Sequence, residues 1–349
     1  MKDKVDLYSN IRVICTLLVV VGHCTNLGLV DSNGYDIIAY TNSVQIVTEY
    51  IREIIYSFHM PLFVSLSGAV FYLTFDDSKS FSSLVCKKAK KLLVPFYVVG
   101  LTILIPVRYF IGYYQNTDVL NTIGRDILMA YDVNYLWYLM MLFQVSVLFY
   151  LIQKMRRFRH SAVVIGAVLF AVSVSSYALP TMLFQVNRVL EFSFWFFAGM
   201  LIEEKRKQLN GKKADLLCMF LIMMWLIAFM IFGYLDEMPG GKKFRFEVKI
   251  FKMCVRYIME MAAVICVYVF FAKHPMRNTR ISELIENYSM DIYLLHVPVI
   301  YIYKKVLALC TSKIVIPNFL YTFFLILGIS IAIVASLFLS RLSRIFTKK

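Results

Sequence analysis

Apolar residues occur along this chain in runs of about 18 to 22, separated by short polar or basic segments. A run of this length crosses a hydrocarbon layer of about 30 Å as a helix, whereas the helices of soluble domains interrupt their apolar residues every few positions. The pattern predicts an all-α fold, a polytopic bundle of about ten membrane helices in one domain over residues 1–349, with no soluble domain. The predicted spans are residues 11–29, 55–75, 92–112, 135–152, 161–180, 188–203, 215–234, 250–272, 288–309 and 317–340.

The composition agrees with this class, since 60% of the residues are hydrophobic, 17% are charged and the mean hydropathy is +0.69. The net charge of +15 does not indicate a nucleic-acid partner. Lys and Arg gather in short clusters between apolar runs, where orientation signals belong, and they are more frequent on the side that holds both termini. We therefore expect a multi-pass protein of the plasma membrane (in a bacterium, the inner membrane), with cytoplasmic termini and with membrane lipid as a partner.

Residues 44–58 have a different pattern, with apolar positions at helical spacing and charged residues elsewhere on the wheel. This pattern predicts an amphipathic helix at the membrane interface, leading into the second span.

The first span carries two polar residues that share one helical face. Arg12 and His23 are eleven residues apart, which is close to three full turns and about 16 Å along the axis. A polar stripe that reaches the bilayer centre is costly unless it faces protein, water or substrate. A neutral imidazole can accept a proton, so His23 is predicted to be the catalytic base. Arg12 is predicted to lie on the same helix face and to belong to the same site. The alternative is a histidine bonded to a neighbouring helix.

Further polar residues lie in or next to the other apolar segments, and we expect them to line a common mid-membrane cavity that binds the substrate. The residues are His59, Ser289, Tyr293, His296, Arg256 and Glu260. Ser289, Tyr293 and His296 share one helix face by their spacing. Arg256 and Glu260 are four residues apart, so a structural ion pair is the favoured interpretation of these two, with a functional role as the alternative.

A basic run precedes the third span and has two interpretations. It comprises Lys87, Lys88, Lys90 and Lys91. The run is typical of an orientation signal that contacts anionic lipid. It also suits a site for the phosphates of a nucleotide-bearing co-substrate, together with Arg12.

Several landmarks follow one another in an order that resembles a known family. They are the Arg12-to-His23 spacing, Phe58-His-Met-Pro-Leu-Phe-Val-Ser-Leu-Ser-Gly68, Lys91-Leu-Leu-Val-Pro95, Leu136-Trp-Tyr-Leu139, Phe196-Phe-Ala-Gly199 and Ser289-Met-Asp-Ile-Tyr-Leu-Leu-His-Val-Pro298. Over most of its length the chain resembles the acyltransferase-3 family of integral-membrane O-acyltransferases, with the sugar 4-O-acetylase-like branch nearest.

The resemblance implies a ten-span enzyme that uses cytoplasmic acyl-CoA, usually acetyl-CoA, as co-substrate. Its acceptor is then a hydroxyl of a carbohydrate, such as a cell-surface polysaccharide or a lipid-linked glycan of the cell envelope. The family's essential histidine and arginine correspond to His23 and Arg12. The run 87–91 departs from the family in having Lys in place of Arg, which disfavours bidentate phosphate contacts there.

Two other functions stay open at this point. A transporter or flippase would use the same mid-membrane polar residues as a path for protons or substrate, although no inverted repeat is evident. A zinc site formed by His23, His59 and His296 is disfavoured, because no carboxylate lies near His23 to support it, and we expect no metal. A homo-oligomer is also left open, since nothing in the sequence decides the oligomeric state.

Overall fold

The computed structural model describes residues 2–25, 42–114, 118–154, 162–176, 179–209, 211, 213–237, 246–277, 279–311 and 318–347. These residues form helices and connections, and no strand is found among them. The chain divides into two compact units. Unit 1 comprises residues 1–12, 57–88 and 141–278, and unit 2 comprises residues 13–56, 89–140 and 279–349. The all-α fold predicted from the sequence is confirmed.

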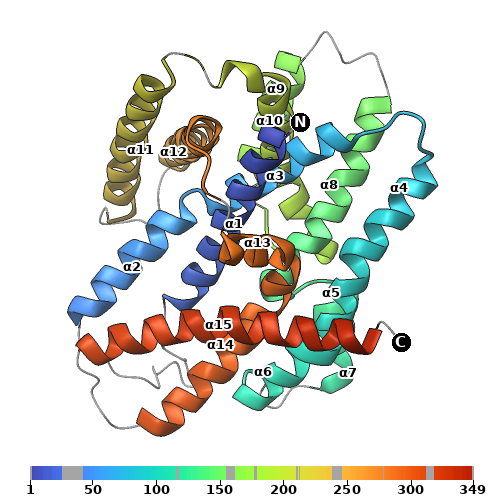
Figure 1. Ribbon diagram of the computed structural model, residues 1–349, viewed down its shortest axis with the longest axis vertical. Helices are drawn as coiled ribbons and strands as arrows, with labels where there is room; N and C mark the ends of the chain where they lie inside the picture. The colour runs from blue at the N-terminus through green and yellow to red at the C-terminus, as the bar shows by residue number, and fades with distance from the viewer. Residues whose placement is uncertain are drawn as a thin grey trace. The chain divides into compact units, whose positions relative to one another are not determined.

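Six helices of 8 to 28 residues lie in unit 1 within the described part of the chain. They are α3 (His59–Thr74), α4 (Phe81–Lys88), α9 (Ala162–Ser176), α10 (Val186–Glu204), α11 (Ala214–Glu237) and α12 (Phe246–Lys273), with the short turns η5 (Leu183–Gln185) and η6 (Arg206–Gln208). Helices α11 and α12 pack side by side, and α10 packs against both α3 and α9 (Figure 1). Few residues of α11 are nevertheless buried, and its exposed side chains are mostly apolar, as expected of a helix that faces lipid.

Two glycines allow α3 and α10 to approach each other closely. A Cβ atom on Gly68 of α3 would lie 1.9 Å from the carbonyl oxygen of Phe196, and one on Gly199 of α10 would lie 1.8 Å from that of Ser65. Each glycine therefore faces the backbone of the other helix. Membrane helices gain little from the hydrophobic effect when they associate, because lipid tails are as apolar as their side chains. Small residues at a crossing instead let the two backbones approach, so that many atoms come into van der Waals contact.

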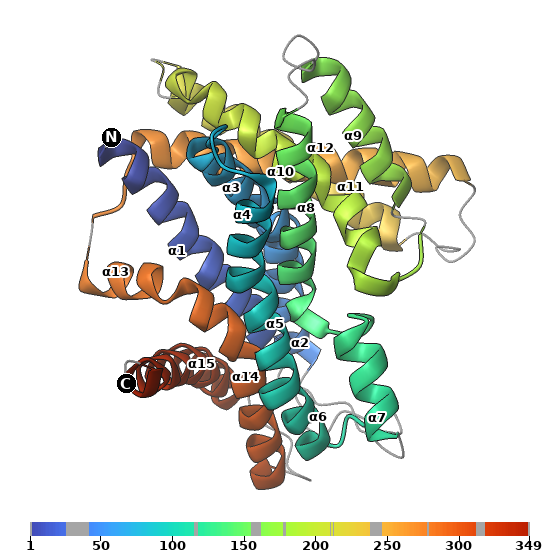
Figure 2. The same cartoon turned by 90° about the vertical axis from the view of Figure 1, so that its right-hand side faces the viewer.

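Unit 2 holds the remaining helices. They are α2 (Asn42–Tyr56), η1 (Ala89–Leu93), α5 (Val94–Val99), η2 (Gly100–Leu104), α6 (Ile105–Ile111), α7 (Val119–Thr122), η3 (Ile123–Leu128), η4 (Asn134–Leu136), α13 (Arg280–Asn287), α14 (Ser289–Thr311) and α15 (Asn318–Thr347). Helix α14 packs against α15 and α6. The pieces η1 to α6 follow one another as a single rod (Figure 2). Two further helices, α1 (Lys2–Cys24) and α8 (Trp137–Lys154), contribute residues to both units.

Among the residues that the structure describes, eight helical segments are long and apolar enough to cross a membrane, which confirms a polytopic bundle. Two of the ten predicted spans differ from these eight. Residues 161–180 correspond to α9, an apolar helix of 15 residues. Residues 188–203 correspond to α10, whose 19 residues include Arg188, Glu191, Glu203 and Glu204, and this charge separates it from the other spans. The predicted amphipathic helix at 44–58 is α2, which ends at Tyr56.

The first span ends earlier than its hydropathy predicts. Helix α1 stops at Cys24, whereas the apolar run continues to residue 29, and residues 26–29 lie outside the part of the chain that the structure describes. His23 therefore occupies the last turn of α1. The sequence pattern instead predicts His23 near the middle of the first span. The end of the helix changes the electrostatics of this residue, because the terminal carbonyl groups carry partial negative charge.

Candidate active site

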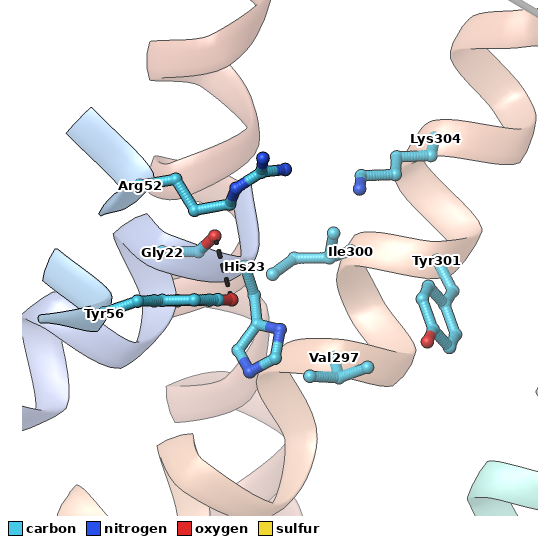
Figure 3. A pocket seen from close by; sticks show the side chains of 8 residues that line it. All are labelled: Gly22, His23, Arg52, Tyr56, Val297, Ile300, Tyr301 and Lys304. Carbon is cyan, nitrogen blue, oxygen red and sulfur yellow. Dashed lines mark hydrogen bonds between the residues drawn. The ribbon is translucent and has the colours of Figure 1, made fainter. Parts of the chain in front are cut away.

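Unit 2 contains a cavity of about 350 Å3 between α1, α2 and α14 (Figure 3). Its lining residues are Gly22 and His23 from α1, Arg52 and Tyr56 from α2, and Val297, Ile300, Tyr301 and Lys304 from α14. The predicted base His23 thus faces a cavity of the size that small-molecule sites require. Five of the eight lining residues carry polar or charged groups that can orient a bound molecule.

The end of α1 shapes one side of this cavity. The last carbonyl groups of a helix have no partner within it, and the carbonyl of Gly22 instead accepts hydrogen bonds from the hydroxyls of Thr25 at 2.8 Å and Tyr56 at 3.4 Å. A Cβ atom on Gly22 would lie 2.8 Å from the Tyr56 ring, so glycine is needed for α2 to approach α1. His23 lies in this last turn, next to the carbonyl groups that form the negative end of the helix dipole.

A proline shapes the opposite side. Pro298 lies inside α14 and has no N–H, so the carbonyl of Leu294 cannot receive its usual helical hydrogen bond. The Tyr135 hydroxyl donates to that carbonyl at 2.5 Å. In return, the Tyr293 hydroxyl donates to the Tyr135 carbonyl. This reciprocal pair fixes α14 against η4, at the level of His296.

His296 lies directly beside His23, with 5.1 Å between the ring centroids. Its side chain is fully buried, and its Nδ1 lies 2.7 Å from the carbonyl oxygen of Tyr293 and 3.1 Å from that of Ile292. Because carbonyl oxygens only accept, this geometry assigns the proton to Nδ1. The Nε2 atom makes no hydrogen bond with any residue that the structure describes. His296 therefore has an unused ring nitrogen next to the cavity wall.

A polar network supports Tyr301 of the cavity wall. The Tyr301 hydroxyl accepts a hydrogen bond of 2.7 Å from Asn134 Nδ2, in the connection between α6 and α8. The same connection is held by the buried Arg108, whose Nη1 donates to the Tyr114 hydroxyl at 2.7 Å and to the Asp132 carbonyl at 3.0 Å. Burial raises the pKa of Tyr114 to about 12, so its hydroxyl stays neutral and keeps its proton. These bonds hold Asp132 and Asn134 in place next to Tyr301.

The structure brings together only some of the residues predicted to bind substrate. His23 lines the cavity and His296 lies beside it. Tyr293 is buried with its hydroxyl bonded to the Tyr135 backbone, and Ser289 begins α14 two turns before His296; neither residue lines the cavity. Helical spacing predicts that Ser289, Tyr293 and His296 share one face of α14. Which part of that face lies next to the cavity depends on Pro298 and on the hydrogen bonds between Tyr135 and α14.

The other predicted residues lie outside this cavity. Arg12, in the unit 1 part of α1, is partly buried, and His59 is buried at the start of α3. Lys87 and Lys88 end α4, and Lys88 lies over the Phe71 ring at 5.7 Å. Lys90 and Lys91 lie in unit 2, on the π-helical segment η1. Among the described residues, no three His, Cys, Asp or Glu side chains are close enough to hold a metal ion.

Arg256 and Glu260 form the ion pair that their spacing predicts. Arg256 Nε lies 2.8 Å from Glu260 Oε1, and Arg256 Nη2 lies 3.6 Å from Oε1 of Glu191 on α10. Glu260 is 2% exposed, whereas Arg256 is 25% exposed. The pair and Glu191 therefore connect α12 to α10 within unit 1, and this arrangement favours the structural role.

Replacing Arg256 with alanine is expected to destabilise the protein by about 3–5 kcal/mol, because Glu260 would stay buried without its partner. The double variant Arg256→Ala/Glu260→Ala should be less destabilised than the single one, and thermal unfolding in detergent measures both. A raised KM for either substrate, with unchanged stability, would instead assign the pair to a binding site.

Four polar residues of the cavity were not anticipated from the sequence: Arg52, Tyr56, Tyr301 and Lys304. Lys304 lies within the apolar run of the ninth span, and a cation at that depth of the membrane is the signal by which it could have been found. Arg52 lies on the polar side of a helix predicted to rest at the interface, so it gave no separate indication.

The fold and the cavity define a polytopic membrane protein with a histidine-containing cavity between its helices. The model of the acyltransferase-3 family, described as an acyltransferase domain, matches residues 8–340. This match covers nearly the whole chain, and the chain therefore belongs to the acyltransferase-3 family. It is a multi-pass membrane acyltransferase. Comparisons with curated proteins and with solved structures find no match.

Proposed function

We propose that the protein transfers an acetyl group from cytoplasmic acetyl-CoA to a hydroxyl of a cell-surface or lipid-linked sugar, as in the sugar 4-O-acetylase-like branch of the family. The observation that carries the proposal is the position of His23. It faces a cavity large enough for a substrate, in the last turn of α1, in a chain that belongs to an acyltransferase family. The protein would lie in a bacterial inner membrane with both termini in the cytoplasm.

In this reaction His23 acts as the general base. It removes the proton from the acceptor hydroxyl as the hydroxyl oxygen attacks the thioester carbonyl, the carbon–sulfur bond breaks, and the coenzyme A thiolate leaves and receives a proton. The helix dipole at the end of α1 stabilises the imidazolium that forms. A transient acyl-histidine would use the same residue as nucleophile.

The donor's phosphates are assigned to Arg12 and to the run of Lys87, Lys88, Lys90 and Lys91. Counted along α1, Arg12 is about 16 Å from His23. The phosphates of coenzyme A are separated from its thioester by the long pantetheine arm, so a cation at such a distance suits them. The run 87–91 adds charge near the predicted cytoplasmic face of the membrane.

The test of the proposed function uses membranes that contain the protein and acetyl-CoA labelled in its acetyl group. Base-labile label should enter the glycan or lipid-linked glycan fraction, well above membranes from an empty-vector control. The fraction that is labelled identifies the acceptor class. If no label enters either fraction while endogenous acceptors are present, the donor or the acceptor assignment is wrong.

Arg12→Ala is expected to raise the KM for acetyl-CoA by about tenfold or more, because one charge-assisted contact to phosphate is lost. Acetyl-pantetheine, which lacks the nucleotide and its phosphates, is the matched control, and its KM should not change. An equal rise for both donors would show that Arg12 acts on something other than those phosphates.

A further inference from the structure

Two cations enter the cavity from opposite walls. Arg52 extends from α2 and Lys304 from α14, and Figure 3 shows their charged ends directed toward the same space above His23. Lys304 is only 7% exposed. Within the described part of the chain, no carboxylate forms an ion pair with either residue.

A buried ammonium group without a counterion is costly, and a second cation across the same cavity increases the cost. An anion bound between Lys304 and Arg52 would lower both the cost of the buried ammonium group and the repulsion between the two cations. The ammonium group is a compact charge with three donors, while the guanidinium offers a planar fork that matches a carboxylate or a phosphate. The chemistry of the cavity is therefore complementary to one anionic group that binds close to His23.

The position of the two cations bears on which substrate carries that group. The reacting atoms must lie next to His23, and the phosphates of the donor are held away from its thioester by the pantetheine arm. A group that binds in the same cavity as His23 therefore belongs to the acceptor. On the proposed topology, both Arg52 and Lys304 also lie toward the outer side of the membrane, where a cell-surface glycan is found.

We propose that Arg52 and Lys304 bind an anionic group of the acceptor, either the carboxylate of a uronic acid or the phosphate of a pyrophosphate-linked glycan. The proposal rests on the proposed function, because it takes the acyl acceptor to be a glycan. It restricts that acceptor to negatively charged glycans and gives the cavity two residues that determine its specificity.

The experiment measures binding to the full-length protein in nanodiscs of phosphatidylcholine, which carries no net charge. The probes are glucuronate, inorganic pyrophosphate, glucose as the neutral analogue, and coenzyme A. The wild-type protein should bind glucuronate or pyrophosphate and bind glucose much more weakly. Lys304→Met and Arg52→Gln should each weaken the binding of that anion about tenfold or more, because each removes one charge-assisted contact, while the affinity for coenzyme A stays the same.

Two further variants serve as controls. Lys304→Arg keeps the charge and should retain most of the anion binding. Lys305→Met makes the same chemical change at the adjacent residue, which does not line the cavity, and should bind as the wild type does. Thermal unfolding of each variant shows whether it has kept its fold.

Three results would overturn the proposal: no binding of either anion by the wild type, anion binding that survives both substitutions in folded protein, or a parallel loss of coenzyme A binding, which would assign the cations to the donor. The binding assay needs no turnover. It therefore reports on this cavity even if labelled acetyl groups are not transferred, so the two failures can be told apart.

Discussion

Replacing His23 with alanine is expected to lower acyl transfer at least 10²-fold, and up to about 10⁴-fold, with little change in protein stability. General-base catalysis contributes about this much to reactions in which a hydroxyl must lose its proton. The imidazole is partly exposed to the cavity, so its removal leaves no large packing defect. The measurement is the initial rate of label transfer from acetyl-CoA in membranes that contain equal amounts of each protein.

Replacing a histidine outside the cavity is the matched control, because it shows whether the loss of any histidine lowers acyl transfer. His274 is exposed and lies 3.4 Å from the Asp215 carboxylate, and it belongs to unit 1. The His274→Ala variant should transfer acetyl groups at the wild-type rate. If His23→Ala also kept its full rate, the assignment of His23 as base or nucleophile would be wrong.

Gly199→Ala is expected to have the largest effect on folding. The added methyl group would lie 1.8 Å from the Ser65 carbonyl oxygen and 2.6 Å from the carbonyl carbon. These are backbone atoms, which cannot rotate away as a side chain can, so α10 and α3 must move apart. Overpacking costs about 1–3 kcal/mol where side chains can adjust, and we expect this substitution to reach or exceed the upper end of that range.

The measurement is the yield of monodisperse protein after extraction, together with its unfolding temperature in detergent. Gly233→Ala is the control, because a Cβ atom added to this glycine of α11 would meet no other side chain or neighbouring helix within 4 Å. Alanine also favours the helix there by up to about 1 kcal/mol. Equal stability of Gly199→Ala and Gly233→Ala would contradict the close approach of α3 and α10.

The sequence anticipated these two sites to different extents. Gly199 and Gly68 each lie in a short segment that resembles the family. The sequence did not say which helix each glycine meets. His23 was identified by its spacing from Arg12, because the two residues belong to one helix and helical geometry alone relates them.

Pairings between distant segments could not be predicted in the same way. His23 and His296 are 273 positions apart, and hydropathy does not tell which face of a membrane helix meets which neighbour. The same limit explains why Tyr293 was placed with His296 in the cavity. Its hydroxyl instead bonds to the backbone of Tyr135, a contact that follows from the carbonyl left free by Pro298.

The sequence by itself determined that this protein is a polytopic membrane helix bundle of the acyltransferase-3 type, with Arg12 and His23 on its first helix. It did so because apolar run length and helical spacing are local properties. Only the tertiary structure decided that α1 ends at Cys24, that His296 lies beside His23, and that Arg52 and Lys304 share its cavity. Those features depend on contacts between helices, which are decided by packing and by the need to satisfy buried polar groups.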